Sequence, residues 1–350
     1  MKRRVSPLLA AAALVLTDRR QADCRWNGAD LRSEQDFPEL LQLGAMEQDA
    51  ADRQMSYDKL TVVTSTRWVA EDLAAAGTID VVPSIGLDVP DLAGSALWCS
   101  GSWALRLAKS GIDHPFLSAG TGWLATVPPE FLRRDVWAGT LEDMPDKGIE
   151  PAFYKLAEHK HSEIPAGLAV GRNGFRTRVI QALGSVIFDG DEIAGLHYVG
   201  SARMDYAREY RCFIAHGKVT ASSFYLATVP GIHDATVTIT WDAYEPDRAP
   251  DSSKAAAFAQ TVVDAMGGNQ PPGYTLDVGE DCDGNFSVVE ANAAWSSNIY
   301  HARAAGVIES ILASQEPGHP RWAWTPDDLF RNRARALPVS GMLRSPHDSL

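Results

Sequence analysis

The chain has 350 residues, which is enough for about two or three domains and a large buried core. Apolar residues make up 45% and charged residues 22%, a composition typical of globular proteins rather than disordered or fibrous ones. The formal net charge of -13 argues against general binding to nucleic acid or to an anionic membrane surface. It does not exclude a small anionic ligand, because a few local cations and metal ions are enough to hold one.

The cysteines and the N-terminus both bear on the compartment. The four cysteines (Cys24, Cys99, Cys212 and Cys282) are far apart and form no C-x-x-C pair, so neither a disulfide framework nor a zinc ribbon is expected. Residues 1–16 have the basic start and apolar run of a signal peptide, but no small-x-small cleavage site follows, and the run is too short to span a bilayer. We expect residues 1–16 to stay in the first domain of a cytoplasmic protein without a membrane partner.

The first 145 residues alternate short apolar runs with helical patterns, which indicates an α/β layer structure. The predicted strands are residues 60–64, 78–82 and 95–99. The predicted helices are residues 67–76 and 101–109, with another helix opening at Pro128-Pro129. Residues 144–148 (MPDKG) are typical of a linker.

Strands dominate the second half of the chain. They are predicted at residues 152–156, 184–188, 196–199, 210–215, 218–225 and 236–241, with a hairpin across His216-Gly217. Helices are predicted at residues 252–266, ending at Gly267-Gly268, and at residues 299–312. We expect the last ~35 residues to form a peripheral or partly flexible tail.

Residues 274–292 (YTLDVGEDCDGNFSVVEAN) form an acidic hairpin with a tight turn predicted at Asp283-Gly284. Pairing the strands outward from this turn places Asp277 opposite Glu290, with Asn292 on the same face. Leu276, Val278, Val289 and Ala291 are predicted to share the other face. Two facing carboxylates repel each other, so the pattern indicates a bound cation, and three hard oxygen donors suit magnesium. The alternative is a solvated hairpin without a ligand.

Further motifs lie around this hairpin, over residues 150–305. In chain order they are Ala152-Phe153-Tyr154-Lys155; Lys160 within EHKHSEIPAG; Val199-Gly200-Ser201-Ala202; Glu209-Tyr210-Arg211-Cys212-Phe213; and Asp277 with Glu290 and Asn292, in VVEANAAWSSNIY. Their types and order resemble the ATP-grasp superfamily of ATP-dependent ligases, in particular a bacterial branch of uncharacterised function. Leu156 stands where the family usually has Pro, no aromatic residue follows Lys160, and Asn298 stands where the branch has Gly. The first half resembles the pre-ATP-grasp domain only loosely.

The resemblance implies an α/β (α+β) fold with an N-terminal α/β domain, similar to a pre-ATP-grasp domain, ahead of a two-lobed ATP-grasp unit. We expect the N-terminal domain over residues 1–145 and the ATP-grasp domain over residues 146–315. Within the latter, the small lobe would cover about residues 150–200 and the large lobe about residues 201–315. Residues 316–350 would form the C-terminal tail.

The resemblance also implies a role for each motif. Lys155 and Lys160 would contact the nucleotide phosphates, and the backbone of Val199, Ser201 and Ala202 would hold adenine. Glu209 would orient the site or contact the ribose. Asp277, Glu290 and Asn292 would hold one or two magnesium ions between the β- and γ-phosphates of ATP.

Arg211 is the candidate catalytic residue. Its planar fork can bind the transferred phosphoryl group or a substrate carboxylate in a geometry that lysine cannot copy. The alternative is an ion pair with Glu209, two residues away on the same strand face. Trp295 and Tyr300 are candidates either for the wall of an acceptor pocket or for aromatic core packing.

The implied reaction is ATP-dependent: a carboxylate is activated as an acyl phosphate and is then attacked by an amine or thiol. Two alternatives remain open, a kinase of the same fold that phosphorylates a hydroxyl and a catalytically weak nucleotide-binding module. The intact metal ligands and Arg211 argue against the weak module. The expected partners are a small-molecule or peptide carboxylate and an amine, and a homodimer is compatible with the sequence.

Overall fold

The computed structural model describes residues 57–84, 90–144, 151–157, 166–182, 195–230 and 236–337. Residues 1–16, Lys160 and the strand predicted at 184–188 lie outside these ranges, so the structure does not bear on them. Within the described ranges, no helix combines the length and the apolarity needed to cross a membrane. The described strands form three sheets, of three, four and five strands.

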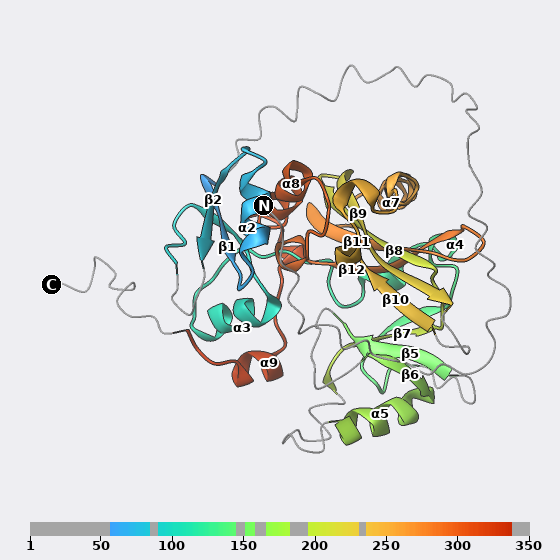
Figure 1. Ribbon diagram of the computed structural model, residues 1–350. Coiled ribbons are helices and arrows are strands. Elements are labelled where there is room, and N and C mark those ends of the chain that lie inside the picture. The colour runs from blue at the N-terminus through green and yellow to red at the C-terminus, as the bar shows by residue number, and fades with distance from the viewer. Residues whose placement is uncertain are drawn as a thin grey trace.

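The first sheet is parallel and lies in the N-terminal part of the chain (Figure 1). Its strands are β1 (Lys59–Val63), β2 (Asp80–Ser84) and β3 (Ser95–Trp98), in the order β2-β1-β3. Helix α2 (Arg67–Ala74) joins β1 to β2, and α3 (Gly101–Lys109) follows β3 and begins at Ser100, whose hydroxyl accepts a hydrogen bond from the Trp103 N–H. The α/β layer structure predicted for this part is confirmed.

The second sheet is antiparallel and has the order β4-β7-β5-β6. Its strands are β4 (Val136–Gly139), β5 (Pro151–Leu156), β6 (Gly167–Val170) and β7 (Tyr198–Ala202). Helix α5 (Gly171–Ala182) covers one face, where Phe175 stacks on Tyr154 with ring centroids 4.9 Å apart. We call this unit the small lobe. Strand β4 belongs to it although it precedes the boundary expected at residue 145.

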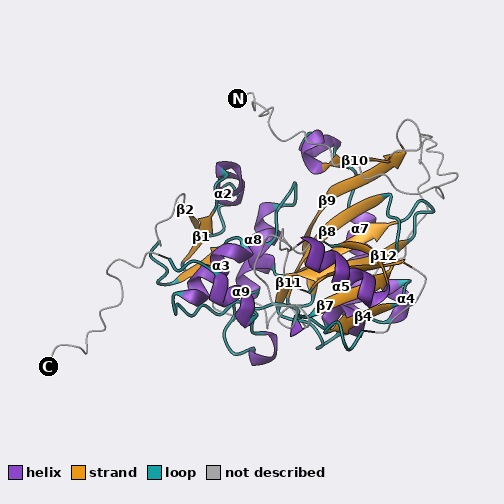
Figure 2. Ribbon diagram, turned by 90° about the horizontal axis from the view of Figure 1, so that it is seen from below, coloured by secondary structure: helices purple, strands orange, loops and turns teal. Residues whose placement is uncertain are grey.

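The third sheet is antiparallel, has the order β10-β9-β8-β11-β12, and is called the large lobe here. Its strands are β8 (Arg208–Ala215), β9 (Lys218–Pro230), β10 (Thr236–Thr240), β11 (Gly273–Glu280) and β12 (Phe286–Asn292). Helix α7 (Ser253–Met266) packs on one face, and α8 (Ala304–Ala313) packs on the other, where it also contacts the N-terminal unit (Figure 2). Phe213 and Arg211 lie on the same face of β8, and α8 covers this face at Phe213. The part of the face that carries Arg211 and its strand neighbour Asp277 is therefore available for the site.

Short elements connect these units. They are η1 (Trp123–Thr126), α4 (Pro129–Leu132), η3 (Trp241–Ala243), η4 (Pro246–Arg248), η5 (Ala294–Ser296), η6 (Pro320–Trp322) and α9 (Asp328–Arg333). The segment from η1 to α4 packs into the large-lobe core through Trp123, Leu124 and Leu132. It therefore brings the N-terminal half of the chain to the edge of the large lobe.

The C-terminal segment, expected to be peripheral or partly flexible, is packed as far as residue 337, and residues 338–350 of the expected tail lie outside the described residues. Helix α9 lies beside α3 (Figure 1). Phe330 on α9 is 4% exposed and joins the small-lobe core, while Leu337 is buried in a core cluster with α3 residues. The Trp324 N–H donates to the Phe116 carbonyl at 2.7 Å. Aromatic and leucine side chains spaced among the polar residues thus anchor a segment whose overall composition is that of a tail.

Candidate active site

The acidic hairpin is formed by β11 and β12, and Asp277 lies opposite Glu290 as predicted. Its turn differs from the prediction: it contains three residues, 282–284, not two. The Asp281 N–H donates to the Asn285 carbonyl at 2.9 Å, and Gly284 adopts a φ of 79°, which glycine tolerates without strain. The Asp281 carboxylate accepts the Asp283 and Asn285 N–H groups and so holds the turn.

A β-bulge then corrects the register. Next to the turn, Glu280 pairs with Phe286 and Val278 with Val288, one residue away from the predicted register, and the shift occurs between Val278 and Asp277. The extra residue, Val289, lets Glu290 face Asp277. Val288 is buried and joins the core, whereas Val289, which was predicted for the core face, is the extra residue of the bulge and is only partly buried. The longer turn shifts the register by one residue and the bulge shifts it back, so the predicted pairing of the two carboxylates is still correct.

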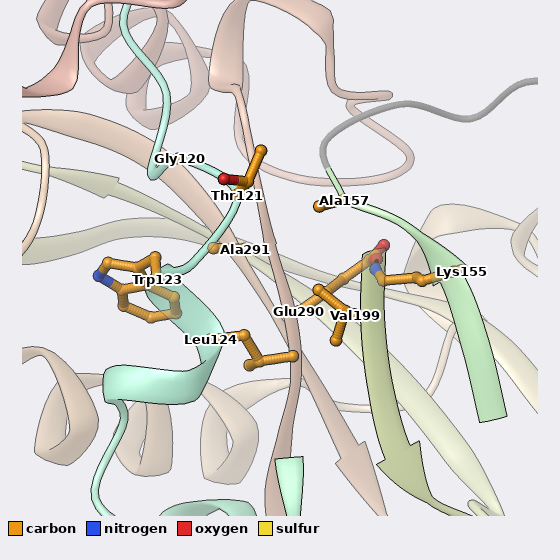
Figure 3. A pocket seen from close by; sticks show the side chains of 9 residues that line it. All are labelled: Gly120, Thr121, Trp123, Leu124, Lys155, Ala157, Val199, Glu290 and Ala291. Atoms are coloured by element: carbon orange, nitrogen blue, oxygen red, sulfur yellow. Dashed lines mark hydrogen bonds and ion pairs between the residues drawn. The ribbon is translucent and has the colours of Figure 1, made fainter. Parts of the chain in front are cut away.

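The side chains of Asp277, Glu290 and Asn292 converge. The Asn292 Nδ2 group lies 3.1 Å from Asp277 Oδ2 and 3.0 Å from Glu290 Oε1, donating to both. Asp277 is fully buried and receives two hydrogen bonds from Arg211, from Nε and Nη2, each of 2.8 Å. Glu290 forms an ion pair with Lys155 of the small lobe (Figure 3). The repulsion expected between the facing carboxylates is therefore offset by two cations and an amide.

Arg211 is 4% exposed and is fixed by Asp277 and by aromatic rings. Its guanidinium carbon lies 5.2 Å from the Tyr300 ring centroid and 5.7 Å from that of Tyr225, and these two rings stack on each other. Burial acts to lower the pKa of Arg211, but the charge and hydrogen bonds of Asp277 outweigh burial and raise it. Within the described residues no hydrogen bond uses Nη1, so the two N–H groups of this atom can bind an anion.

Glu209 does not occupy the position of Arg211's partner. Its carboxylate accepts a hydrogen bond from the Tyr225 hydroxyl, while Arg211 pairs with Asp277 on the neighbouring strand. Burial raises the pKa of Tyr225 well above its usual value, with the Asp277 and Glu209 charges acting in the same direction, so this hydroxyl remains a donor. The Glu209 carboxylate thereby anchors a ring that lies against Arg211.

The three convergent side chains fit a magnesium ion. All of them offer hard oxygen atoms, and the Asn292 amide lies where it bridges the two carboxylates. Because amide oxygen and nitrogen are placed by their hydrogen bonds, a cation at this point would turn the amide oxygen inward. In the described part of the chain no group of three His, Cys, Asp or Glu side chains forms a metal cluster. The third donor here is the asparagine.

A small pocket that is open to solvent lies beside the Lys155–Glu290 pair (Figure 3). The N-terminal half, the small lobe and the large lobe all contribute to its wall, which consists of Gly120, Thr121, Trp123, Leu124, Lys155, Ala157, Val199, Glu290 and Ala291. Of these, sequence analysis selected Lys155, Val199 and Glu290. The segment 120–124 was missed, although its Gly-Thr-Gly run between apolar residues is a turn signal.

Strand β7 carries the predicted adenine-binding segment and lies inside the small-lobe sheet, between β4 and β5. Val199 lines the pocket, Ser201 is 6% exposed, and Ala202 is exposed. Neighbouring strands flank this segment on both sides, so an adenine contact through its backbone stays a prediction. The same holds for the ribose contact of Glu209, and Lys160 lies outside the described residues.

The two aromatic candidates separate clearly. Trp295 is 2% exposed, stacks with Phe116 at 4.2 Å and donates to the Leu117 carbonyl, so it is a core residue between the N-terminal unit and the large lobe. Tyr300 lies against Arg211 and Trp241, and its φ of 48° is unusual for a non-glycine residue. Only Tyr300 thus lies at the site.

Comparison with solved structures gives distant matches. The chain is similar to a D-alanine–D-alanine ligase from Bacillus anthracis (14% identity, 73% of this chain and 98% of that chain, TM-score 0.40). It is also similar to the D-cycloserine synthetase DcsG (15% identity, 73% of this chain and 99% of that chain, TM-score 0.40). A third match is an N5-carboxyaminoimidazole synthetase from Staphylococcus aureus (10% identity, 73% of this chain and 77% of that chain, TM-score 0.39). These likenesses are too weak to support an argument about the reaction.

Comparison with protein families is decisive. No curated protein matches the chain in sequence. A family model described as "ATP-grasp domain, R2K clade family 2" matches residues 131–310, which is more than half of the chain and includes both lobes with the hairpin. The fold class and the family predicted from the motifs are confirmed, and the chain belongs to the ATP-grasp superfamily, in family 2 of the R2K clade.

Proposed function

We propose that this protein is an ATP- and magnesium-dependent ligase that joins a carboxylate to an amine in the cytoplasm and releases ADP and phosphate. The observation that carries the proposal is the convergence of Asp277, Glu290 and Asn292 between two cations, Arg211 and Lys155. Oxygen donors of this type hold magnesium, and cations next to them bind phosphate and carboxylate groups. The pocket beside them receives residues from all three units, so the nucleotide and substrates would meet there.

In the first step a substrate carboxylate oxygen attacks the γ-phosphorus of ATP. The bond from this phosphorus to the β–γ bridging oxygen breaks, ADP leaves with the electron pair, and an acyl phosphate forms. Such a transfer depends on positioning and charge neutralisation more than on a protein nucleophile. Magnesium, held by Asp277, Glu290 and Asn292, would neutralise phosphate charge. Lys155, which now pairs with Glu290, would instead contact a phosphate oxygen.

In the second step the amine nitrogen attacks the carbonyl carbon of the acyl phosphate. The carbon–oxygen bond to phosphate breaks, inorganic phosphate leaves, and the nitrogen loses a proton. Arg211 supports both steps, because Asp277 and the tyrosine rings hold its guanidinium while the Nη1 donors remain for the phosphoryl or carboxylate oxygens. A rigid donor of this kind needs little reorganisation during the reaction.

The experiment incubates the purified full chain with ATP, magnesium and a pool of amino acids and short peptides. An ADP assay and mass spectrometry then follow the products, with Glu290→Gln as the inactive control. We expect pool-dependent ADP release and a product equal to two components minus water. A product that gains only a phosphoryl group would identify a kinase. ATP binding without any turnover would contradict both and leave a nucleotide-binding module.

A further inference from the structure

Arg134 links three segments around the β-bulge of β12. It lies between α4 and β4, and the two protons of its Nη1 atom are shared among the Val288 carbonyl at 2.6 Å, the Leu132 carbonyl at 3.1 Å and the Tyr206 hydroxyl at 3.1 Å. Its Nη2 atom donates to the Val289 carbonyl at 3.1 Å. One guanidinium thus ties the edge of the large lobe to the chain that enters the small lobe.

The contact of Arg134 with the two valine carbonyls depends on the β-bulge. In a regular strand successive carbonyls point to opposite sides, but here the carbonyls of Val288 and Val289 both accept from Arg134. That is possible because the bulge turns one of them round. The planar fork of arginine suits two acceptors at this spacing, whereas a lysine ammonium is a single point charge.

The bulge decides which face Glu290 occupies. The three-residue turn alone would continue the register of Val278 with Val288 and would place Val289 opposite Asp277. Glu290 and Asn292 would then point into the core face, because a shift of one residue reverses every side chain of a strand. The extra residue in the bulge restores both side chains to the face of Asp277.

The surroundings of Arg134 show that this contact is built into the fold. The Tyr206 hydroxyl that it contacts also bonds to Ser287 Oγ at 3.0 Å, next to the bulge. Tyr206 lies on the segment between β7 and β8 that joins the two lobes, and its ring packs so closely on Gly279 that a Cβ there would lie 2.2 Å from it. Among the described residues Arg134 forms no ion pair with a carboxylate, so neutral oxygens hold a partly buried cation.

We infer that Arg134 is a positioning residue for the metal site: it holds the β-bulge at Val288–Val289 and thereby places Glu290 and Asn292 beside Asp277. The inference rests on the proposed function for its metal consequence, whereas the effect on the bulge can be measured without any ligand. Mutation of a residue that orients metal ligands from outside the coordination sphere typically weakens metal affinity by about 10- to 100-fold.

The test compares Arg134→Lys and Arg134→Ala with wild type and with Arg133→Lys, a matched control at the exposed neighbouring position. Hydrogen exchange on the ligand-free proteins compares a peptide covering residues 286–292 with one covering β8. The dissociation constant of Mn²⁺, used as a probe for Mg²⁺, is measured by electron paramagnetic resonance in the presence of the ATP analogue AMP-PNP. Ethylguanidinium is then added to Arg134→Ala.

We expect faster exchange over residues 286–292 in both Arg134 variants, with β8 unchanged, and Mn²⁺ affinity weakened by about tenfold or more. AMP-PNP affinity without metal should change less than about twofold, and ethylguanidinium should restore part of the Mn²⁺ affinity. Unchanged exchange over residues 286–292, or wild-type Mn²⁺ affinity in Arg134→Lys, would overturn the inference. If wild type itself binds no Mn²⁺, the proposed function fails, and exchange alone decides whether Arg134 holds the bulge.

Discussion

The two carboxylates of the site are paired with cations in different ways. Asp277 and Arg211 come from adjacent strands of one sheet, and their side chains are 1% and 5% exposed. Glu290 and Lys155 come from different lobes, and their side chains are 13% and 23% exposed. The first pair has two parallel hydrogen bonds and lies against aromatic rings, while the second borders the pocket.

This difference indicates two roles. Removing one partner of a buried, bidentate pair leaves an uncompensated charge, so the first pair is part of the folded state itself. A partly exposed pair between lobes contributes little to stability and can open when a phosphate competes for the lysine. We therefore expect Arg211 to be fixed throughout and Lys155 to change partner on nucleotide binding. Four predictions test this contrast.

The largest effect is expected from Arg211→Met. The substitution leaves Asp277 buried without its cation and should lower the free energy of unfolding by about 3–5 kcal/mol, measured by urea denaturation. Adding Asp277→Asn should recover much of the loss, because it removes the uncompensated charge. The control is Arg208→Met, on the same strand with a side chain 37% exposed, which should cost no more than about 1 kcal/mol. An equal loss of unfolding free energy in Arg211→Met and Arg208→Met would contradict the structural role assigned to the Asp277–Arg211 pair.

Glu290→Gln should abolish the response to magnesium-ATP while leaving the fold intact. Ligand at 100 times its dissociation constant stabilises a protein by about 2.7 kcal/mol, so the melting temperature of wild type should rise by several degrees and that of the variant should not. The unliganded variant should stay within about 1 kcal/mol of wild type, because Asn292 and the cations already offset the repulsion from Asp277. An equal thermal shift in both proteins would remove Glu290 from the metal site.

The sequence allowed this contrast to be predicted only in part. Alternation along β11 and β12 placed Asp277 opposite Glu290, and Ser252 and Gly267 marked the ends of α7, since such signals are local. The partner of Arg211 was not predicted, because Asp277 reaches it from another strand, 66 positions along the chain. The pairing of Lys155 with Glu290 spans 135 positions and depends on how the lobes meet.

The bulge shows a different limit. A two-residue turn and a regular ladder give the same Asp277–Glu290 pairing as a three-residue turn with one bulge. The pairing was therefore predicted correctly although the turn length and the regular ladder were predicted wrongly. The carbonyl contacts of Arg134, which accompany the bulge, come from a segment with no pattern that points to β12. The pocket wall at residues 120–124 and the place of β4 in the small lobe likewise depend on tertiary packing.

A smaller effect is expected from Lys155→Ala. If Lys155 moves to a phosphate, its loss should weaken magnesium-ATP binding by about tenfold, or 1.4 kcal/mol, in isothermal titration calorimetry. Stability of the unliganded protein should change by less than about 1 kcal/mol, since the pair is partly exposed. Lys218→Ala, at another exposed strand position, is the control for general loss of positive charge. Wild-type affinity in a folded Lys155→Ala protein would exclude the exchange of partners.

The smallest effect is expected from His114, which lies in neither pair and so serves as a reference for both. Its Nε2 atom lies 2.7 Å from Gln315 Oε1, and the fully buried Gln315 amide also bonds both backbone groups of Leu97 on β3. Burial lowers the pKa of His114, against weaker opposing effects of Gln315 and Asp113.

A histidine whose pKa is lower in the folded than in the unfolded state stabilises the fold above about pH 6.5, and this contribution is lost as the pH falls. Urea denaturation at about pH 7.5 and 5.5 should therefore show lower stability at the acidic pH, and His114→Gln should reduce the difference equally in wild type and in Lys155→Ala. A reduction that depends on Lys155 would mean that the contact between the N-terminal sheet and the large lobe is coupled to the pair between the lobes.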